Sequence, residues 1–223
     1  MKSLPPGKRT LKAPAGRVRR VPVPVPDGRR IGLLGGSFNP AHGGHLDISR
    51  LALELLDLDE IWWLVSPQNP LKAADGMAAL TDRVDAATRV ADGHPIVVTD
   101  VEADMGTRFT ADTLVALQAR YPGARFVWLM GADNLCQVHK WRDWSRIFHT
   151  VPVAVFARPT YSLRAEQSKA ARRFARYRVK PYRAAGLATR RAPAWVLFKR
   201  PHNPVSATKI RESRSAPAAA GTR

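Results

Sequence analysis

The sequence lacks the features that would cross-link, export or anchor the chain. It has one cysteine, Cys136, in 223 residues, which excludes an intrachain disulfide framework and a multi-cysteine metal site and favours a reducing compartment. No apolar run approaches the ~18 residues of a membrane-spanning helix, and the basic N-terminal region lacks the apolar stretch of a secretory signal. These absences predict a soluble, cytoplasmic protein, and 45% hydrophobic residues are enough to form a packed core.

Acidic residues are scarce at both ends of the chain. The formal net charge is +18, divided into +8 over residues 1–30, −5 over residues 31–157 and +15 over residues 158–223. Six prolines in residues 1–30 disfavour helix and central strand there. We therefore expect a basic, Pro/Arg-rich disordered arm at 1–30, a single domain at 31–213 and a disordered tail at 214–223.

Between these ends, apolar runs typical of buried strands alternate with amphipathic segments typical of helices. Strands are expected at residues 30–34, 61–65, 96–98, 126–130, 151–156 and 195–198. Helices are expected at 43–56, 81–91, 110–121, 162–177 and 206–214, and in a stretch that contains Trp141 and Trp144. This alternation predicts an α/β fold with a mainly parallel sheet, helices on both faces, and ligands at the carboxyl ends of the strands.

The first candidate site follows the first expected strand, where residues 35–45 read GGSFNPAHGGH. Two glycines let the backbone approach a ligand closely, and the helix start that follows offers N–H groups suited to phosphate. His42 and His45 lie one helical turn apart, so both imidazoles can donate to the same anion. The alternative is that the pair only caps the helix or decorates the surface; no third residue has the spacing for a zinc site.

The second candidate site is VSATKIR, residues 205–211. Ser206 is a candidate N-cap, and Thr208, Lys209 and Arg211 would lie within the first helical turn or so. A hydroxyl, an ammonium and a guanidinium beside free N–H groups make an anion site. The alternative is a capped surface helix in a basic tail.

Together, the two motifs resemble the nucleotidyltransferase superfamily, with its H-x-G-H loop and S-S/A-T-x-x-R helix start. The spelling is similar to the bacterial nicotinate-mononucleotide adenylyltransferase family, from about residue 31 to residue 213. Further segments similar to that family occur in order: SPQNPLK at 66–72, RFTADTL at 108–114, GADNL at 131–135 followed by two tryptophans, and VFARP at 155–159. Leu71 stands where the family has histidine, leaving Lys72 as the cation of that loop, and residues 1–30 have no counterpart in the family's core.

The resemblance implies a Rossmann-like nucleotidyltransferase fold and a reaction. ATP and nicotinate mononucleotide would give deamido-NAD and pyrophosphate, with Mg²⁺ accompanying ATP, no protein-held metal and no covalent enzyme intermediate. His42, His45 and Arg211 would be catalytic. ATP would be bound by Gly35, Gly36, Ser37, Phe38, Lys72, Asp133, Ser206, Thr208 and Lys209.

The resemblance also implies a place for the pyridine ring. Thr110 and Trp141 would frame it, with Trp141 stacking on its flat face. A purely structural role is the alternative for these residues. Trp141 could pack in the core, and core packing is the favoured role for Trp144. Asp133 could be the N-cap of the helix that follows it.

Two competing interpretations remain open at this point. Phosphopantetheine adenylyltransferase shares both motifs, but it is usually shorter and lacks the Trp141 segment. A basic RNA-binding protein would explain the charge, but the charge is placed in arms rather than on one patterned face, and no nucleic-acid-reading motif is present. We therefore expect no membrane partner and no specific nucleic acid, leave oligomerisation open, and expect a fragment of residues 31–213 to keep transferase activity.

Overall fold

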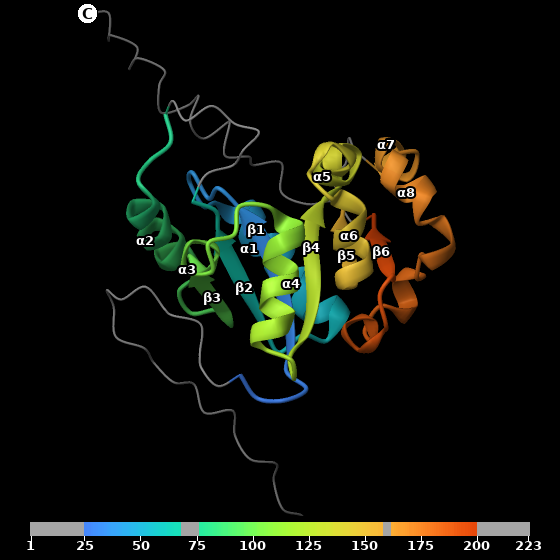
Figure 1. Cartoon of the computed structure of the whole chain (residues 1–223), viewed down its shortest axis with the longest axis horizontal. Coiled ribbons are helices and arrows are strands. Elements are labelled where there is room, and N and C mark those ends of the chain that lie inside the picture. The colour runs from blue at the N-terminus through green and yellow to red at the C-terminus, as the bar shows by residue number, and fades with distance from the viewer. Residues whose placement is uncertain (1–24, 68–75, 158–161, 200–223) are drawn as a thin grey trace, which may run out of the picture.

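The computed structural model describes residues 25–67, 76–157 and 162–199, and these form a three-layer α/β fold (Figure 1). The central sheet has six strands in the order β3-β2-β1-β4-β5-β6, and every neighbouring pair is parallel. The predicted α/β class and parallel sheet are confirmed. The strands are β1 (Arg30–Gly36), β2 (Glu60–Val65), β3 (Ile96–Thr99), β4 (Arg125–Gly131), β5 (Val153–Phe156) and β6 (Trp195–Phe198).

Helices cover both faces of this sheet. The α-helices are α1 (Gly43–Leu56), α2 (Leu80–Ala91), α3 (Val101–Asp104), α4 (Thr110–Arg120), α5 (Ala132–Gln137), α6 (Trp144–Thr150), α7 (Ser162–Glu166) and α8 (Lys169–Arg173). Four 3₁₀ turns are η1 (Val138–Lys140), η2 (Ala175–Tyr177), η3 (Pro181–Arg183) and η4 (Leu187–Thr189). One core lies under α1 and α2, and the other under α4, α5, α6 and α8. No helix in the described residues is long and apolar enough to cross a membrane.

The strands read as continuous apolar runs because both of their faces are covered. In β2, Trp62 belongs to the core under α4 and its neighbour Trp63 to the core under α1, and both are fully buried. Successive strand residues point to opposite faces, so a strand covered on both sides needs apolar residues at every position. This is why the strand positions could be located from the sequence.

The prediction of one continuous helix at 162–177 is wrong. The segment is broken into α7, α8 and η2, because the Ser168 hydroxyl accepts a hydrogen bond from the Ala171 N–H (3.1 Å) and starts a new helix there. The helical stretch around Trp141 is also interrupted, because Trp141 is extended between η1 and α6. The short helix α3 was not predicted, and the helix expected at 206–214 lies outside the described residues.

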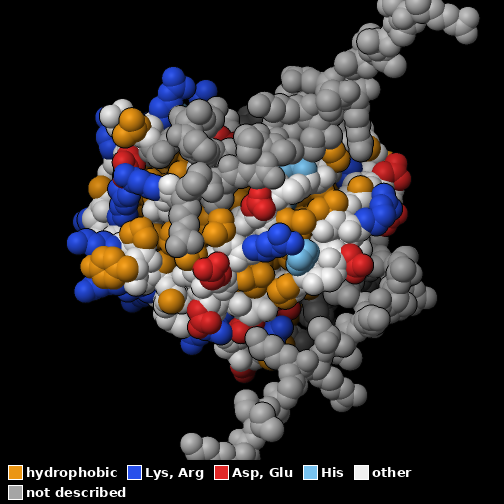
Figure 2. All heavy atoms as spheres, turned by 180° about the vertical axis from the view of Figure 1, so that it is seen from behind, with side chains coloured by type: hydrophobic (Ala, Val, Ile, Leu, Met, Phe, Trp, Pro, Cys, Tyr) orange, Lys and Arg blue, Asp and Glu red, His pale blue; other side chains and the backbone are white. Residues whose placement is uncertain are grey.

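Positive charge is not confined to the arms. Residues 162–199 carry eleven Lys and Arg residues against one acidic residue, Glu166, and they belong to the described fold. Seen from behind, Lys and Arg side chains gather at the left of the molecule, on the side of α7 and α8 (Figure 2). Glu166 pairs with Arg178 (2.9 Å) and Lys199 (3.0 Å), so most of this charge has no acidic neighbour in the same segment.

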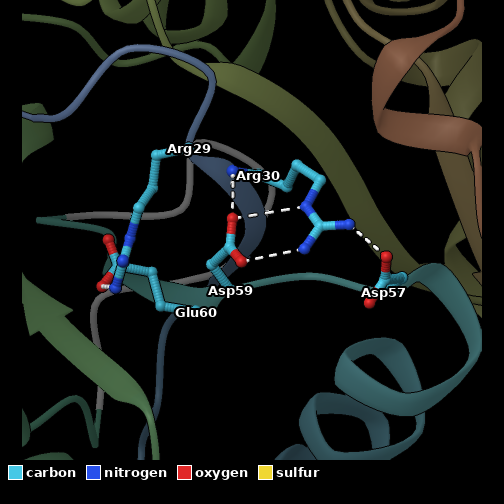
Figure 3. Close-up of polar contacts among 5 residues, drawn as sticks. All are labelled: Arg29, Arg30, Asp57, Asp59 and Glu60. Atoms are coloured by element: carbon cyan, nitrogen blue, oxygen red, sulfur yellow. Dashed lines mark hydrogen bonds and ion pairs between the residues drawn. The ribbon is translucent and has the colours of Figure 1, made fainter. Parts of the chain in front are cut away.

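The fold begins before residue 31. Arg30 is the first residue of β1, and its side chain and N–H bond both Asp59 oxygens, while its guanidinium also pairs with Asp57 (Figure 3). Arg29 pairs with Glu60 at 3.2 Å. A fragment starting at residue 31 would lose these ion pairs, so residue 25 is the better start. The arm itself stays a prediction, because residues 1–24 lie outside the described residues.

We expect Asp59→Asn to destabilise the protein near neutral pH by about 1–2 kcal/mol, because a partly buried, charge-assisted pair is lost. Hydrogen bonds from Arg30 lower the pKa of Asp59. The stabilisation is therefore present above the ordinary Asp pKa and disappears as pH falls through the lowered value. Urea unfolding against pH measures this, with exposed Asp85→Asn as the control. The pair lies at the amino ends of β1 and β2, so kcat should not change.

Candidate active site

The sheet order reverses between β1 and β4, which are direct neighbours. Chains leave the carboxyl ends of these two strands toward opposite faces of the sheet, which opens a crevice where ligands bind in such folds. The predicted GGSFNP loop follows β1 at this point, and α5 follows β4. The loop therefore lies at the carboxyl ends of the strands, where the sequence predicts that ligands bind.

His42 and His45 are brought together at the start of α1, with ring centroids 3.9 Å apart. Nδ1 of His42 accepts from the Gly44 N–H (3.1 Å), and Nδ1 of His45 accepts from the His42 N–H (3.2 Å). The two rings thus form a reciprocal capping box. Because both Nδ1 atoms accept, the proton of each neutral ring is on Nε2. Capping therefore orients two Nε2–H donors from adjacent rings, and the capping and phosphate interpretations are compatible.

An aromatic support lies beneath this pair. The Phe38 ring is 4.6 Å from the His45 ring and stacks on Trp63 at 5.1 Å. Trp63 donates through Nε1 to the Ser49 hydroxyl (2.8 Å), which in turn donates to the His45 carbonyl (2.9 Å). Phe38 is 1% exposed and its ring supports His45, and its predicted contact with ATP stays a prediction.

Gly35 has a packing explanation. A Cβ at Gly35 would lie 2.4 Å from Cη2 of Trp128 on β4, which no side chain tolerates. At Gly36 the nearest atom would be Phe38 Cε2 at 3.4 Å, an ordinary contact. Glycine at position 35 therefore allows β1 and the Trp128 indole to pack closely. This packing role is separate from the predicted approach of a nucleotide to the backbone.

Asp133 lies in the first turn of α5, directly after β4. The N-cap of α5 is Gly131, so the N-cap alternative for Asp133 is wrong. Oδ1 of Asp133 is buried without a hydrogen-bond partner, and it lies 2.4 Å from where a Cβ of Gly131 would be. An unsatisfied carboxylate oxygen at the switch point is suited to accept from a hydroxyl or an amine.

Thr110 and Trp141 come from segments that touch. Thr110 is the first residue of α4, and Trp141 is half-buried against the core just after η1. The neighbouring residues Phe109 and Arg142 are in contact, with the guanidinium carbon 4.7 Å from the ring centroid. Trp144, in contrast, packs edge-on against Phe148 and Phe174, as the core interpretation predicts.

Arg83 was not predicted as a site residue. Its side chain is 3% exposed, and it donates to four backbone carbonyls, those of Ser37, Ser66, Pro67 and Ala78, at 2.7–3.0 Å. Burial lowers the pKa of this guanidinium. The signal in the sequence is its position: Arg83 shares the inward face of α2 with Val84 and Ala87, where the helical period calls for an apolar residue.

Glu102 was also missed. It is 8% exposed, and its carboxylate accepts from the Thr113 hydroxyl (3.0 Å) and from the side chain of Ser66. Burial raises its pKa, and the two hydrogen bonds offset part of that effect. Ser66, the first residue after β2, is thus held by Glu102 through its hydroxyl and by Arg83 through its carbonyl.

We expect Glu102→Gln to stabilise the protein relative to the parent as pH rises. The raised pKa means that the folded state binds the proton more tightly than the unfolded chain. Folding stability from this residue is therefore lost between the ordinary Glu pKa and the raised value, and Gln avoids that loss. Urea unfolding of the parent, Glu102→Gln and exposed Glu54→Gln over about pH 4–8 measures the difference. A difference that is constant with pH would contradict it.

The remaining predicted site residues lie outside the described residues. These are Lys72, Ser206, Thr208, Lys209 and Arg211. Among the residues that the structure describes, no group of three or more His, Cys, Asp or Glu side chains could hold a metal ion.

Comparison with known proteins places the chain in a family. Residues 33–213 match the cytidylyltransferase-like family model. The chain belongs to this family. A probable nicotinate-nucleotide adenylyltransferase from Cereibacter sphaeroides is 55% identical over 181 residues, covering 81% of this chain and 96% of the relative. A protein of the same description from Parvibaculum lavamentivorans is 50% identical and covers 83% of this chain and 92% of its own length.

A solved structure shares the fold of this cytidylyltransferase-like chain. It is Plasmodium falciparum nicotinic acid mononucleotide adenylyltransferase complexed with NaAD, with a TM-score of 0.64 at 16% identity and 85% coverage of both chains. This likeness confirms the predicted nucleotidyltransferase fold. The sequence relatives, which are close over nearly their whole length, identify the chain with nicotinate-nucleotide adenylyltransferases.

Proposed function

We propose that the chain transfers AMP from ATP to nicotinate mononucleotide, giving deamido-NAD and pyrophosphate. The 5′-phosphate of the mononucleotide attacks the α-phosphorus of ATP in line. The new bond joins the phosphate oxygen to the α-phosphorus, and the bond from the α-phosphorus to the bridging oxygen of pyrophosphate breaks. No protein nucleophile takes part, so catalysis rests on position and charge stabilisation.

The observation that carries this proposal is the histidine pair at the switch point. Two adjacent imidazoles present Nε2–H donors at a helix start, which suits an anion whose charge grows during the reaction. We place the ATP phosphates on His42 and His45. Arg211, Ser206, Thr208, Lys209 and Lys72 are assigned to the same phosphates by their motifs alone.

Asp133 is placed at the sugar or adenine group. Its buried, unpartnered oxygen would accept from a ribose hydroxyl or the adenine amine. Phe38 contributes by supporting the His45 ring, and Gly35 contributes by letting β1 pack closely against Trp128.

Mg²⁺ is proposed to enter with ATP. Magnesium usually keeps several waters and is held through substrate phosphates with few protein carboxylates. Bound there, it neutralises part of the phosphate charge. We also place the reaction in the cytoplasm, because the single cysteine suits a reducing compartment.

Pyrophosphate release tests the proposal. The full chain is incubated with ATP, Mg²⁺ and one acceptor at a time: nicotinate mononucleotide, nicotinamide mononucleotide or phosphopantetheine. We expect the fastest release with nicotinate mononucleotide and none above background with phosphopantetheine. Release only with phosphopantetheine would replace the proposal with the rival activity, and release with none of the three would reject both.

A further inference from the structure

Arg83 closes the gap where β1 and β2 part. The last bond of their ladder runs from the Ser66 N–H to the Gly36 carbonyl (2.9 Å). One residue further along, the carbonyls of Ser37 and Ser66 both accept from the same atom, Nη1 of Arg83, at 2.7 and 2.8 Å. A single nitrogen thus holds together the loops that leave two neighbouring strands.

The other donors of Arg83 extend this connection. Nη2 bonds the Pro67 carbonyl (3.0 Å), and Nε bonds the Ala78 carbonyl just before α2 (2.9 Å). No carboxylate among the described residues pairs with this guanidinium, so four carbonyl dipoles compensate its buried charge. A rigid fork of N–H donors suits four carbonyls in fixed directions, and a lysine ammonium, with three donors on one atom, does not.

The residue after Ser37 shows why this hold matters. Phe38 has a φ of 47°, in the left-handed region that a bulky side chain rarely adopts, and its ring supports His45. Such a conformation costs free energy and persists only when its surroundings hold it in place. The Arg83 bond to the Ser37 carbonyl fixes the peptide that enters this conformation.

We propose that Arg83 is a positioning residue for adenylyl transfer: by fixing Ser37 against the loop after β2, it holds Phe38 and so the His42–His45 pair in place. This rests on the proposed function, because the pair is taken to bind the ATP phosphates. Arg83 itself need not touch the nucleotide.

The test compares Arg83→Ala and Arg83→Lys with Arg89→Ala, an exposed arginine on the same helix. We expect both Arg83 variants to lower kcat by about tenfold, while KM for nicotinate mononucleotide stays within about twofold. Guanidinium chloride added to Arg83→Ala, far below denaturing concentration, should restore part of kcat, and methylammonium should restore less. Arg89→Ala should match the parent.

A second measurement does not depend on turnover. Hydrogen exchange of peptides covering residues 37–45 should be faster in Arg83→Lys, while exchange at β4 and β5 is unchanged. Arg83→Lys keeps the charge, so it remains informative if Arg83→Ala fails to fold. Unchanged exchange at 37–45, or a lower melting temperature with kcat unaltered in the folded enzyme, overturns the positioning role. An inactive parent with faster exchange in the variant would reject the proposed function and leave the Arg83 contact network confirmed.

Discussion

Alanine at His42 or at His45 should lower kcat by about 10²–10³-fold, the usual cost of losing one preorganised donor to developing charge. Each imidazole offers an Nε2–H whose orientation is set by the capping bond at Nδ1. The core should remain intact, because neither histidine belongs to a core cluster: the His45 ring packs on Phe38, a member of one cluster, and the His42 ring packs on His45. Steady-state pyrophosphate release at saturating substrates measures the effect.

Capping must be separated from catalysis in this experiment. His42→Ala removes both functions and also costs about 0.5–2 kcal/mol of helix stability. His42→Asn keeps a good N-cap acceptor for the Gly44 N–H and removes the distal donor. We therefore expect His42→Asn to have the melting temperature of the parent but the lowered kcat of His42→Ala. His94→Ala, at the amino end of β3, is the matched control. Normal turnover in His42→Asn would reduce His42 to a helix cap.

The strands of the sheet and most of its helices could be predicted because local patterns determine them. Each strand is a continuous apolar run, and α1 repeats its inward residues Ile48, Ala52 and Leu56 at helical spacing. The region 162–177 shows the limit of this reasoning. Its basic composition is compatible with one long helix, but the Ser168 hydroxyl offers a competing cap, and which of the two is more stable depends on packing against α5 and η1.

The site was only partly predictable for a different reason. The histidine pair follows from spacing within one short segment, whereas Arg83 acts on carbonyls up to 46 residues away. Nothing local to α2 shows that an inward arginine will meet Ser37 and Ser66. Gly35 was interpreted as room for a ligand, but the atom that requires glycine there is on Trp128, three strands later in the chain. Long-range partners of this kind become visible only once the strands are paired.

The second large effect concerns the choice of mononucleotide, which should favour nicotinate over nicotinamide by at least about tenfold in kcat/KM. The two rings differ by a carboxylate in place of an amide. α4 begins at Thr110 without a capping side chain, because the N-cap residue is Phe109. Its first N–H groups and the positive end of its dipole can therefore receive a carboxylate. An amide NH₂ would face the same donors unpaired, at a cost of about 1–3 kcal/mol for each donor.

Trp141 provides the matched test of where this ring binds. Its half-buried indole packs against the core, and the next residue, Arg142, contacts Phe109 just before α4. Trp141→Ala should raise KM for both mononucleotides through lost stacking, with little change in KM for ATP and a preserved preference for nicotinate. Trp144→Ala should instead lower the melting temperature without a selective change in KM, because Trp144 packs edge-on against Phe148 and Phe174. Equal kcat/KM for the two mononucleotides would remove the start of α4 as the carboxylate site. If Trp141→Ala leaves KM for both mononucleotides unaltered, the pyridine ring binds elsewhere, because loss of a stacking partner must weaken binding of the ring.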